Sequence, residues 1–438
     1  MILIVAACSM TALVRPEIGM YCFVWLSFFS PSSMTWGAQE LPFAQIVAVG
    51  TMAGFLFWRE KKRFPFQRES VLLLALWIMF YISTTFALRP NSAFDKFKYI
   101  SKVLIMVFLC TAIIKNEKSL LVLLRIIAVS LGFFGLKGGV WAIKTGGTYE
   151  VYGPLMSWLF ANNSIGLALS MNIPILYYLS KIDPNKWCKR LYALMIVFSF
   201  PAIICTFSRG AWLGGGIVAF LILARHRKRI LLVPAAIVLS GIALLMFSDS
   251  IPERVTGRYG QLVNYEEEGS AESRFWNWEF CKRVGIANPF TGAGFEYYTR
   301  DAYLMYYPEF IKRWPGKVWN CHSTWYSIFS EHGFPGLIIW VSLMISSLIT
   351  LRNMRRYGKT NPGKFHYTHY ADMLEGGLFA FMVVGSFIDA AYYEIYYYFI
   401  AIIIIINAQV KDDSHHHPNV GIPDPVNVHP DQSRLRTV

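Results

Sequence analysis

The stretch VWNCHSTWYSIFSEHGFPGLIIW, residues 318–340, constrains the fold most strongly. It begins as a polar, aromatic loop and continues as an apolar run. A helix needs about 20 predominantly apolar residues to cross a bilayer, and we expect this span to cover 322–351. His322 lies where the loop meets the helix. The sequence therefore predicts a transmembrane helix with a histidine at its mouth.

The composition of the whole chain favours a membrane protein. Hydrophobic residues make up 55% and charged residues 16% of its 438 residues, whereas ordinary soluble domains carry about 25% charged residues. A chain with so few polar side chains needs lipid as its solvent. We predict an all-α polytopic membrane protein with about twelve transmembrane helices.

Apolar runs separated by short basic loops define the expected spans. The first is broken near Arg15-Pro16, where a short hairpin is the alternative to one interrupted span. The spans are 1–30, 43–58, 70–88, 98–114, 119–143, 161–180, 190–207, 210–224, 230–247, 322–351, 372–389 and 391–409.

Basic residues cluster in the loops between these spans, which explains the net charge of +14 without a nucleic-acid partner. Such loops stay in the cytoplasm, and counting spans then puts both termini there. The clusters lie at 58–63, 186–190, 225–229 and 352–356.

One connection differs from all the others. Residues 248–321 carry near-balanced charges and many aromatic side chains, so we expect an external, periplasmic loop between transmembrane segments 1–247 and 322–410. Loops this long are usually functional or disordered. Within it, 272–285 predicts a helix on the membrane interface. The tail 411–438 has no apolar period and predicts disorder.

The cysteines and histidines do not predict a metal site. No cysteine spacing suits a metal, and the histidine triplet 415–417 lies in the tail without fixed geometry. Cys281 and Cys321 both fall in the external loop, where an oxidising compartment would permit a disulfide. The sequence alone does not assign this pairing.

Arg209, Arg274 and His322 are all expected at the external membrane surface. Taken singly, an arginine at a membrane edge can simply reach for lipid phosphates, and a boundary histidine can cap or pack. Together they suit one substrate. The guanidinium fork binds phosphate oxygens in pairs, and a histidine near neutrality accepts a proton from a hydroxyl.

The motifs around these residues resemble the O-antigen ligase family, which includes O-antigen polymerases and protein O-oligosaccharyltransferases. The resemblance covers about residues 150–340, and the N-terminal stretch 15–37 is similar to the exosortase-associated O-glycosylation ligase branch. The motifs are TFSRG at 206–210, ESRFWNW at 272–278, NPFTGAGF at 288–295 and NCHSTW with EHGFPG at 320–336.

The resemblance implies a glycosyltransferase of the bacterial inner membrane with a periplasmic site. Arg209 and Arg274 would bind the undecaprenyl diphosphate of a glycan donor, and His322 would activate the acceptor hydroxyl. The favoured acceptor is the lipid A–core of lipopolysaccharide, with polymerisation or transfer to protein as alternatives. The reaction would invert the anomeric carbon and need no cofactor or metal.

Five further residues are weaker candidates. Lys137 within a span is costly enough to suggest function, namely a contact to the donor phosphate. Asn163 matches a family asparagine, and Asp389 and Tyr392 are candidate sugar contacts. Glu331 lies nine residues after His322, half a turn out of phase and about 13 Å along a helix axis, which favours a structural role.

A lipid-linked sugar transporter is the rival from another class. Such proteins commonly contain internal repeats with sites at mid-membrane. We find no repeat, and the informative polar residues gather at one surface.

Overall fold

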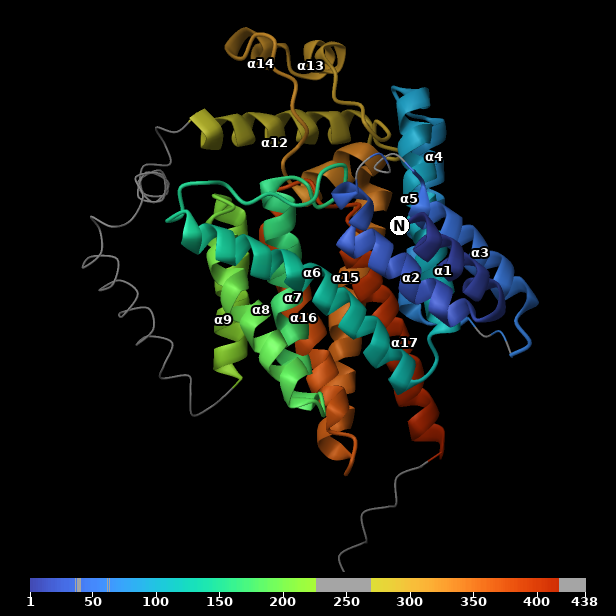
Figure 1. Cartoon of the computed structure of the whole chain (residues 1–438). Coiled ribbons are helices and arrows are strands. Elements are labelled where there is room, and N and C mark those ends of the chain that lie inside the picture. Colours follow the sequence, from blue (N-terminus) through green and yellow to red (C-terminus); the bar gives the residue numbers. More distant parts are fainter. Residues whose placement is uncertain (36, 38–40, 61, 63, 226–268, 417–438) are drawn as a thin grey trace, which may run out of the picture.

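The computed structural model describes residues 1–35, 37, 41–60, 62, 64–225 and 269–416. The described residues form α-helices and one short 3-10 helix (Figure 1). The expected span 230–247 lies outside them, as do 248–268 of the external loop and 417–438 of the tail.

The helices follow the apolar runs closely. They are α1 (Ile2–Val14), α2 (Pro16–Phe29), α3 (Phe43–Phe57), α4 (Arg68–Thr85), α5 (Pro90–Ile113), α6 (Glu117–Lys144), α7 (Asn162–Ile182), α8 (Lys186–Ile204), α9 (Arg209–Ala224), α12 (Gly269–Ala287), α13 (Arg300–Tyr306), α14 (Pro308–Arg313), α15 (Thr324–Thr360), α16 (His366–Gly385) and α17 (Glu394–His416), with the 3-10 helix at Pro31–Met34.

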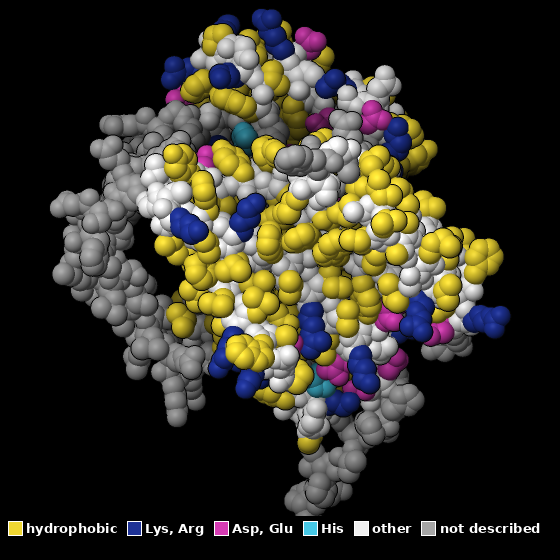
Figure 2. Space-filling view, in the orientation of Figure 1, with side chains coloured by type: hydrophobic (Ala, Val, Ile, Leu, Met, Phe, Trp, Pro, Cys, Tyr) yellow, Lys and Arg dark blue, Asp and Glu magenta, His cyan; other side chains and the backbone are white. Residues whose placement is uncertain are grey.

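Six of the described helices are long and apolar enough to cross a membrane: α4, α6, α7, α8, α15 and α17. Four more are apolar but shorter, namely α1, α2, α3 and α9. Figure 2 shows a belt of mainly hydrophobic side chains between two zones richer in charge. The all-α fold is confirmed and a multi-pass membrane protein is supported, whereas the count of twelve spans stays a prediction.

The first thirty residues form a helical hairpin rather than one interrupted span. A proline disfavours helical geometry in the residue before it. Accordingly, α1 ends at Val14, Arg15 is not helical, and α2 begins at Pro16. The Sγ atoms of Cys8 and Cys22 lie 2.9 Å apart, so the two helices run antiparallel. The alternative left open by the sequence is the correct one. Counting spans therefore no longer assigns a side to the N-terminus.

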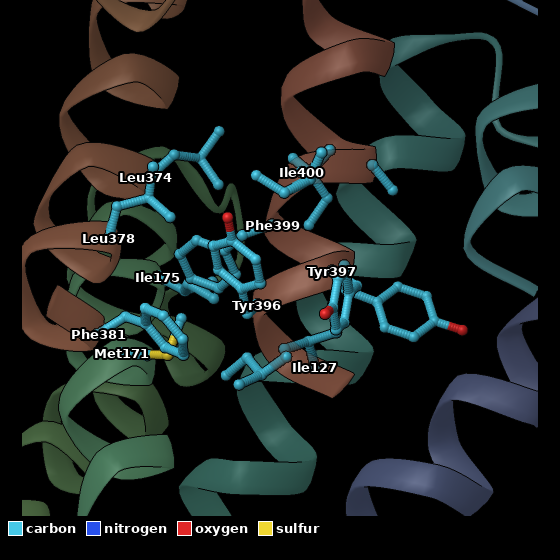
Figure 3. Packing of buried hydrophobic residues seen from close by; sticks show 14 of the residues in the cluster. Ile127, Met171, Ile175, Leu374, Leu378, Phe381, Tyr396, Tyr397, Phe399 and Ile400 are labelled. Carbon is cyan, nitrogen blue, oxygen red and sulfur yellow. The ribbon is translucent and has the colours of Figure 1, made fainter. Parts of the chain in front are cut away.

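The core of the bundle surrounds α17. Ile395 through Ile406 are all at most 2% exposed, as expected of a helix that is hydrophobic on every face. Figure 3 shows Phe381 and Met171, from α16 and α7, packed against Tyr396 of α17. This central packing fixes the ends of the helices that carry the candidate site.

Helices α12, α13 and α14 form a separate lobe across one end of the bundle, which we call the α12 end (Figure 1). The prediction of a helix over 272–285 is confirmed by α12. The lobe has its own buried cluster, in which Phe280 stacks on Tyr303 at 3.6 Å between ring centroids. A disulfide joins Cys281 to Cys321 and ties the lobe to the residues ahead of α15.

The tail begins later than expected. Residues 411–416, predicted to be disordered, continue α17. Asp413 explains this extension, because its carboxylate pairs with Lys364 at 2.6 Å and accepts a hydrogen bond from Tyr367 at 2.7 Å. These contacts hold the last turns of α17 against the start of α16.

Candidate functional site

One face of α12 carries Arg274 towards α15. Arg274, Trp278, Cys281 and Gly285 follow one another at spacings of four, three and four residues, so they share a helical face. Trp278 stacks on Tyr326 of α15 at 5.7 Å. Gly285 packs against Phe329 one turn further along α15. Arg274 therefore lies on the face that α12 turns to the mouth of α15.

His322 is fixed by its neighbours on both sides. Cys321 before it is held by the disulfide, and α15 begins two residues after it. Its backbone has φ 49°, a left-handed conformation that few residues other than glycine adopt. The side chain is half-buried. This tight turn holds the imidazole at the junction of lobe and bundle.

Arg274 and His322 interact electrostatically. Burial, and then the nearby Arg274 cation, lower the pKa of His322 from 6.5 to about 4. Both causes act against the charged form of the imidazole. His322 is therefore neutral across the physiological range, with a nitrogen lone pair able to accept a proton.

Arg209 is the first residue of α9, at the end of a tight turn from α8. Phe207 adopts a left-handed φ of 50°, and the Ser208 side chain caps α9 by accepting a hydrogen bond from the Ala211 N–H. Gly210 lies against Phe387, at 3.3 Å from the position of an added Cβ. The start of α9 thus touches residues 386–393, which we call the linker.

The start of α15 touches the same linker. The Thr324 hydroxyl donates to the Ile388 carbonyl at 3.0 Å and accepts from the Ala390 N–H at 3.1 Å. Trp325 donates to the Ser386 hydroxyl at 3.0 Å. The helix that follows His322 and the helix that begins with Arg209 are therefore joined through one segment, which brings these two site residues to a common region.

Asn163 and Asp389 lie around this region as well. Asn163 is in the first turn of α7, next to Ser164, which hydrogen-bonds Tyr393 of the linker. Asp389 is in the linker itself, and burial raises its pKa to about 6. Its Oδ1 atom is buried without a hydrogen-bond partner among the described residues.

Tyr392 of the linker also contacts Glu331 of α15. The Tyr392 hydroxyl hydrogen-bonds Glu331, and the same oxygen lies 2.7 Å from Nε2 of His332. Glu331 also accepts the N–H of Glu296 at 3.3 Å. None of these contacts is with His322, and the structural role expected for Glu331 stays a prediction. Tyr392 ties the linker to α15.

The loop 288–295 docks onto a break in α15. Gly333 has φ 66° and interrupts the helix, and the Phe334 N–H donates to the Pro289 carbonyl at 2.8 Å. Ala293 N–H donates to the Ser330 carbonyl at 2.8 Å. Two motifs far apart in sequence thus share backbone hydrogen bonds.

Lys137 lines a cavity that does not include the candidate residues described above. It is exposed on α6 and lines a cavity of about 460 Å³ together with Trp141, Glu150 and Tyr152. That cavity contains none of the other predicted site residues. The structure therefore gives no support for grouping Lys137 with Arg274 and His322.

Comparison with protein families identifies two regions. Residues 194–341 match the O-antigen ligase family. This region of the chain is therefore similar to the O-antigen ligase family. Residues 1–183 match a family of unknown function, DUF5935. No curated protein matches the chain.

The O-antigen ligase region contains four predicted residues: Arg209, Arg274, His322 and Glu331. Members of the O-antigen ligase family are ligase- or polymerase-type glycosyltransferases. The other four are outside it: Lys137 and Asn163 fall in the region of unknown function, and Asp389 and Tyr392 follow both.

Sequence reasoning missed Thr324 and Lys96. Thr324 binds the linker from the first turn of α15. Lys96 of α5 pairs with Glu296 at 3.2 Å and lies 5.9 Å from the Tyr392 ring. Lys96 precedes the expected span 98–114, so hydropathy gave no signal for it, and its pairing with Glu296 is a contact between distant segments. Among the described residues no group of three or more metal-ligating side chains occurs.

Proposed function

We propose that the protein transfers a preassembled glycan from undecaprenyl diphosphate to the lipid A–core of lipopolysaccharide at the periplasmic face of the bacterial inner membrane. The observation that carries this proposal is the proximity of Arg274 to His322. It joins a phosphate-binding group to a neutral base, which is what displacement of a diphosphate by a hydroxyl requires.

The arrangement of helices supports an anionic donor at this site. Helices α7, α9 and α15 all begin at the linker, and each helix N-terminus carries a partial positive charge of about half a unit. Together with Arg209 and Arg274, these termini favour a diphosphate. Hydrogen bonds from charged donors contribute about 1.5–3 kcal/mol each.

In this mechanism His322 takes the proton of the acceptor hydroxyl while the oxygen attacks the anomeric carbon. The new glycosidic bond forms as the bond from that carbon to the diphosphate oxygen breaks, so the configuration inverts. The departing oxygen gains negative charge, which the arginines stabilise more strongly than in the ground state.

The negative charge of the bound donor would also raise the pKa of His322. Arg274 disfavours the protonated form of His322 in the free protein. A bound diphosphate offsets that cation and raises the pKa of the imidazole, because an opposite charge favours the charged form. His322 becomes a better proton acceptor when the donor is present, which favours transfer over reaction of an empty site.

The acceptor separates this proposal from its two alternatives on the same scaffold. Purified protein given the lipid-linked glycan should glycosylate rough lipopolysaccharide. Elongation of the lipid-linked glycan itself would indicate a polymerase, and transfer only to a pilin-like protein would indicate a protein O-oligosaccharyltransferase. Either result would replace the lipid A–core as acceptor.

We also propose that the reaction needs no metal ion or cofactor, since the bond between sugar and diphosphate supplies the driving force. Transfer should persist in EDTA. Loss of transfer in EDTA, with recovery on adding a divalent ion, would contradict this part of the mechanism.

A further inference from the structure

A cavity of about 760 Å³ lies at the end of the bundle opposite α12, which we call the basic end because Arg225 and Arg355 lie there. Its walls come from the last turns of α7, α9 and α15 and the first turns of α16. These are the helices whose other ends meet at the linker. The proposed glycan transfer does not use this cavity.

The cavity has an apolar part. Val218, Leu221 and Ile222 of α9 face Pro174 of α7 and Met373 of α16. Together these side chains offer a wall suited to hydrocarbon. A solvent-filled crevice at a membrane surface would leave this apolar area in contact with water at a cost of about 25 cal/mol per Å².

The charged part is organised by two arginines. Arg225 donates to the Asp372 carbonyl at 2.6 Å and pairs with Glu375, and Arg355 pairs with both acidic residues, at 2.8 Å from Asp372. This network joins α9, α15 and α16 and neutralises both carboxylates. It provides a rigid polar rim beside the apolar wall.

Two lysines complete the rim. Lys181 and Lys359 are exposed, and neither forms an ion pair within the part of the chain that the structure describes. The lining holds four cationic side chains, Lys181, Arg225, Arg355 and Lys359, against two carboxylates, Asp372 and Glu375. The excess is two positive charges with histidine neutral.

We infer that this cavity binds an anionic phospholipid. Its acyl chain would lie against Leu221 and its neighbours, and the headgroup phosphate would meet Lys181 and Lys359. Basic pockets between transmembrane helices on the cytoplasmic side bind anionic headgroups of this kind. Tyr177, Tyr178 and Phe365 add aromatic side chains to the lining, and such side chains are enriched at membrane interfaces.

The test uses the full chain in detergent, with phosphatidylglycerol, cardiolipin or phosphatidylcholine added, and counts bound lipids by native mass spectrometry. Lys181→Gln with Lys359→Gln removes the two rim charges. Leu221→Trp fills the apolar wall without changing charge. Lys118→Gln with Lys186→Gln is the control, because it removes two exposed lysines that do not line the cavity.

The wild type and the control should retain an anionic lipid in preference to phosphatidylcholine. At about 1 kcal/mol per lysine, the rim variant should bind it roughly 30-fold more weakly. The tryptophan variant should lose the bound lipid as well. Equal retention by all variants, or a loss in the rim variant with full retention in the tryptophan variant, would overturn the assignment.

Discussion

The charge of Arg274, on α12, acts on His322 ahead of α15 and, after burial, helps to hold the pKa of the imidazole at about 4. The two residues belong to separate parts of the fold, the lobe and the mouth of a bundle helix. Their proximity depends on the disulfide, on stacking of Trp278 against Tyr326, and on the close approach permitted by Gly285.

Replacing His322 by alanine should remove the base and leave the fold and donor binding intact. Transfer should fall by about 10²–10⁴-fold, measured with purified protein and a lipid-linked donor. His366→Ala, at the basic end, is the matched control and should transfer normally. Near-normal transfer by the His322 variant would exclude this residue as the base.

Arg274→Lys should impair transfer far more than a change that keeps the charge would suggest. Lysine presents a point charge, whereas the guanidinium fork binds two phosphate oxygens at once. The KM for the donor should rise and kcat should fall. Arg283→Lys on the same helix, whose guanidinium pairs with Glu279 and lies over Tyr307, is the control. Equal activities of the two variants would rule out paired phosphate contact at Arg274.

The pH profile provides an independent check on the contact between Arg274 and His322. In the wild type His322 is neutral above about pH 4. Arg274→Gln removes a cation, so the pKa of the histidine should rise towards 6.5, though not fully because burial remains the larger cause. The acidic limb of the residual activity should move to higher pH. An unmoved limb would mean that the two groups do not interact.

Removing the disulfide should destabilise the lobe and lower activity together. Cys281 and Cys321 are 40 residues apart, and closing loops of such length typically stabilises a fold by about 2–4 kcal/mol. Cys281→Ser with Cys321→Ser should lower the melting temperature, and reductant should do the same to the wild type. Cys188→Ser, a free cysteine on α8, should have no such effect.

Gly333→Ala should disturb the break in α15. Its backbone, at φ 66° and ψ −168°, is a region that only glycine adopts without a cost of about 1–3 kcal/mol. An added Cβ would also lie 2.5 Å from the Pro289 carbonyl oxygen. Gly216→Ala is the control, since nothing lies within 4 Å of its Cβ position. Equal melting temperatures would show that the loop 288–295 does not depend on this glycine.

The sequence predicted the parts that local patterns encode. Hydropathy located α15 and placed His322 at its mouth, and the aromatic spacing located α12. The segments that each helix end contacts could not be predicted, because periodicity carries no information on contacts between distant segments. The linker, the docking of 288–295 onto Gly333 and the pairing of Lys96 with Glu296 are all of this kind.

The hairpin at Arg15-Pro16 illustrates the same limit. Pro16 disfavours helical geometry at Arg15. Both a kink within one span and a reversal into a hairpin are compatible with that break. Packing decides between them: Gly19 approaches Ala12 so closely that an added Cβ would lie 2.5 Å from the alanine Cβ. Only the three-dimensional contact between α1 and α2 identifies the reversal.

The bond between Cys281 and Cys321 bears on when the lobe becomes cross-linked to the mouth of α15. Thiols of newly made chains stay reduced in the cytosol and pair only in an oxidising compartment. Before the disulfide forms, only the polypeptide backbone links the lobe to the bundle. In the proposed periplasmic orientation, a chain whose lobe had not been exported would lack this cross-link, and the electrostatic contact between Arg274 and His322 would then depend on packing alone.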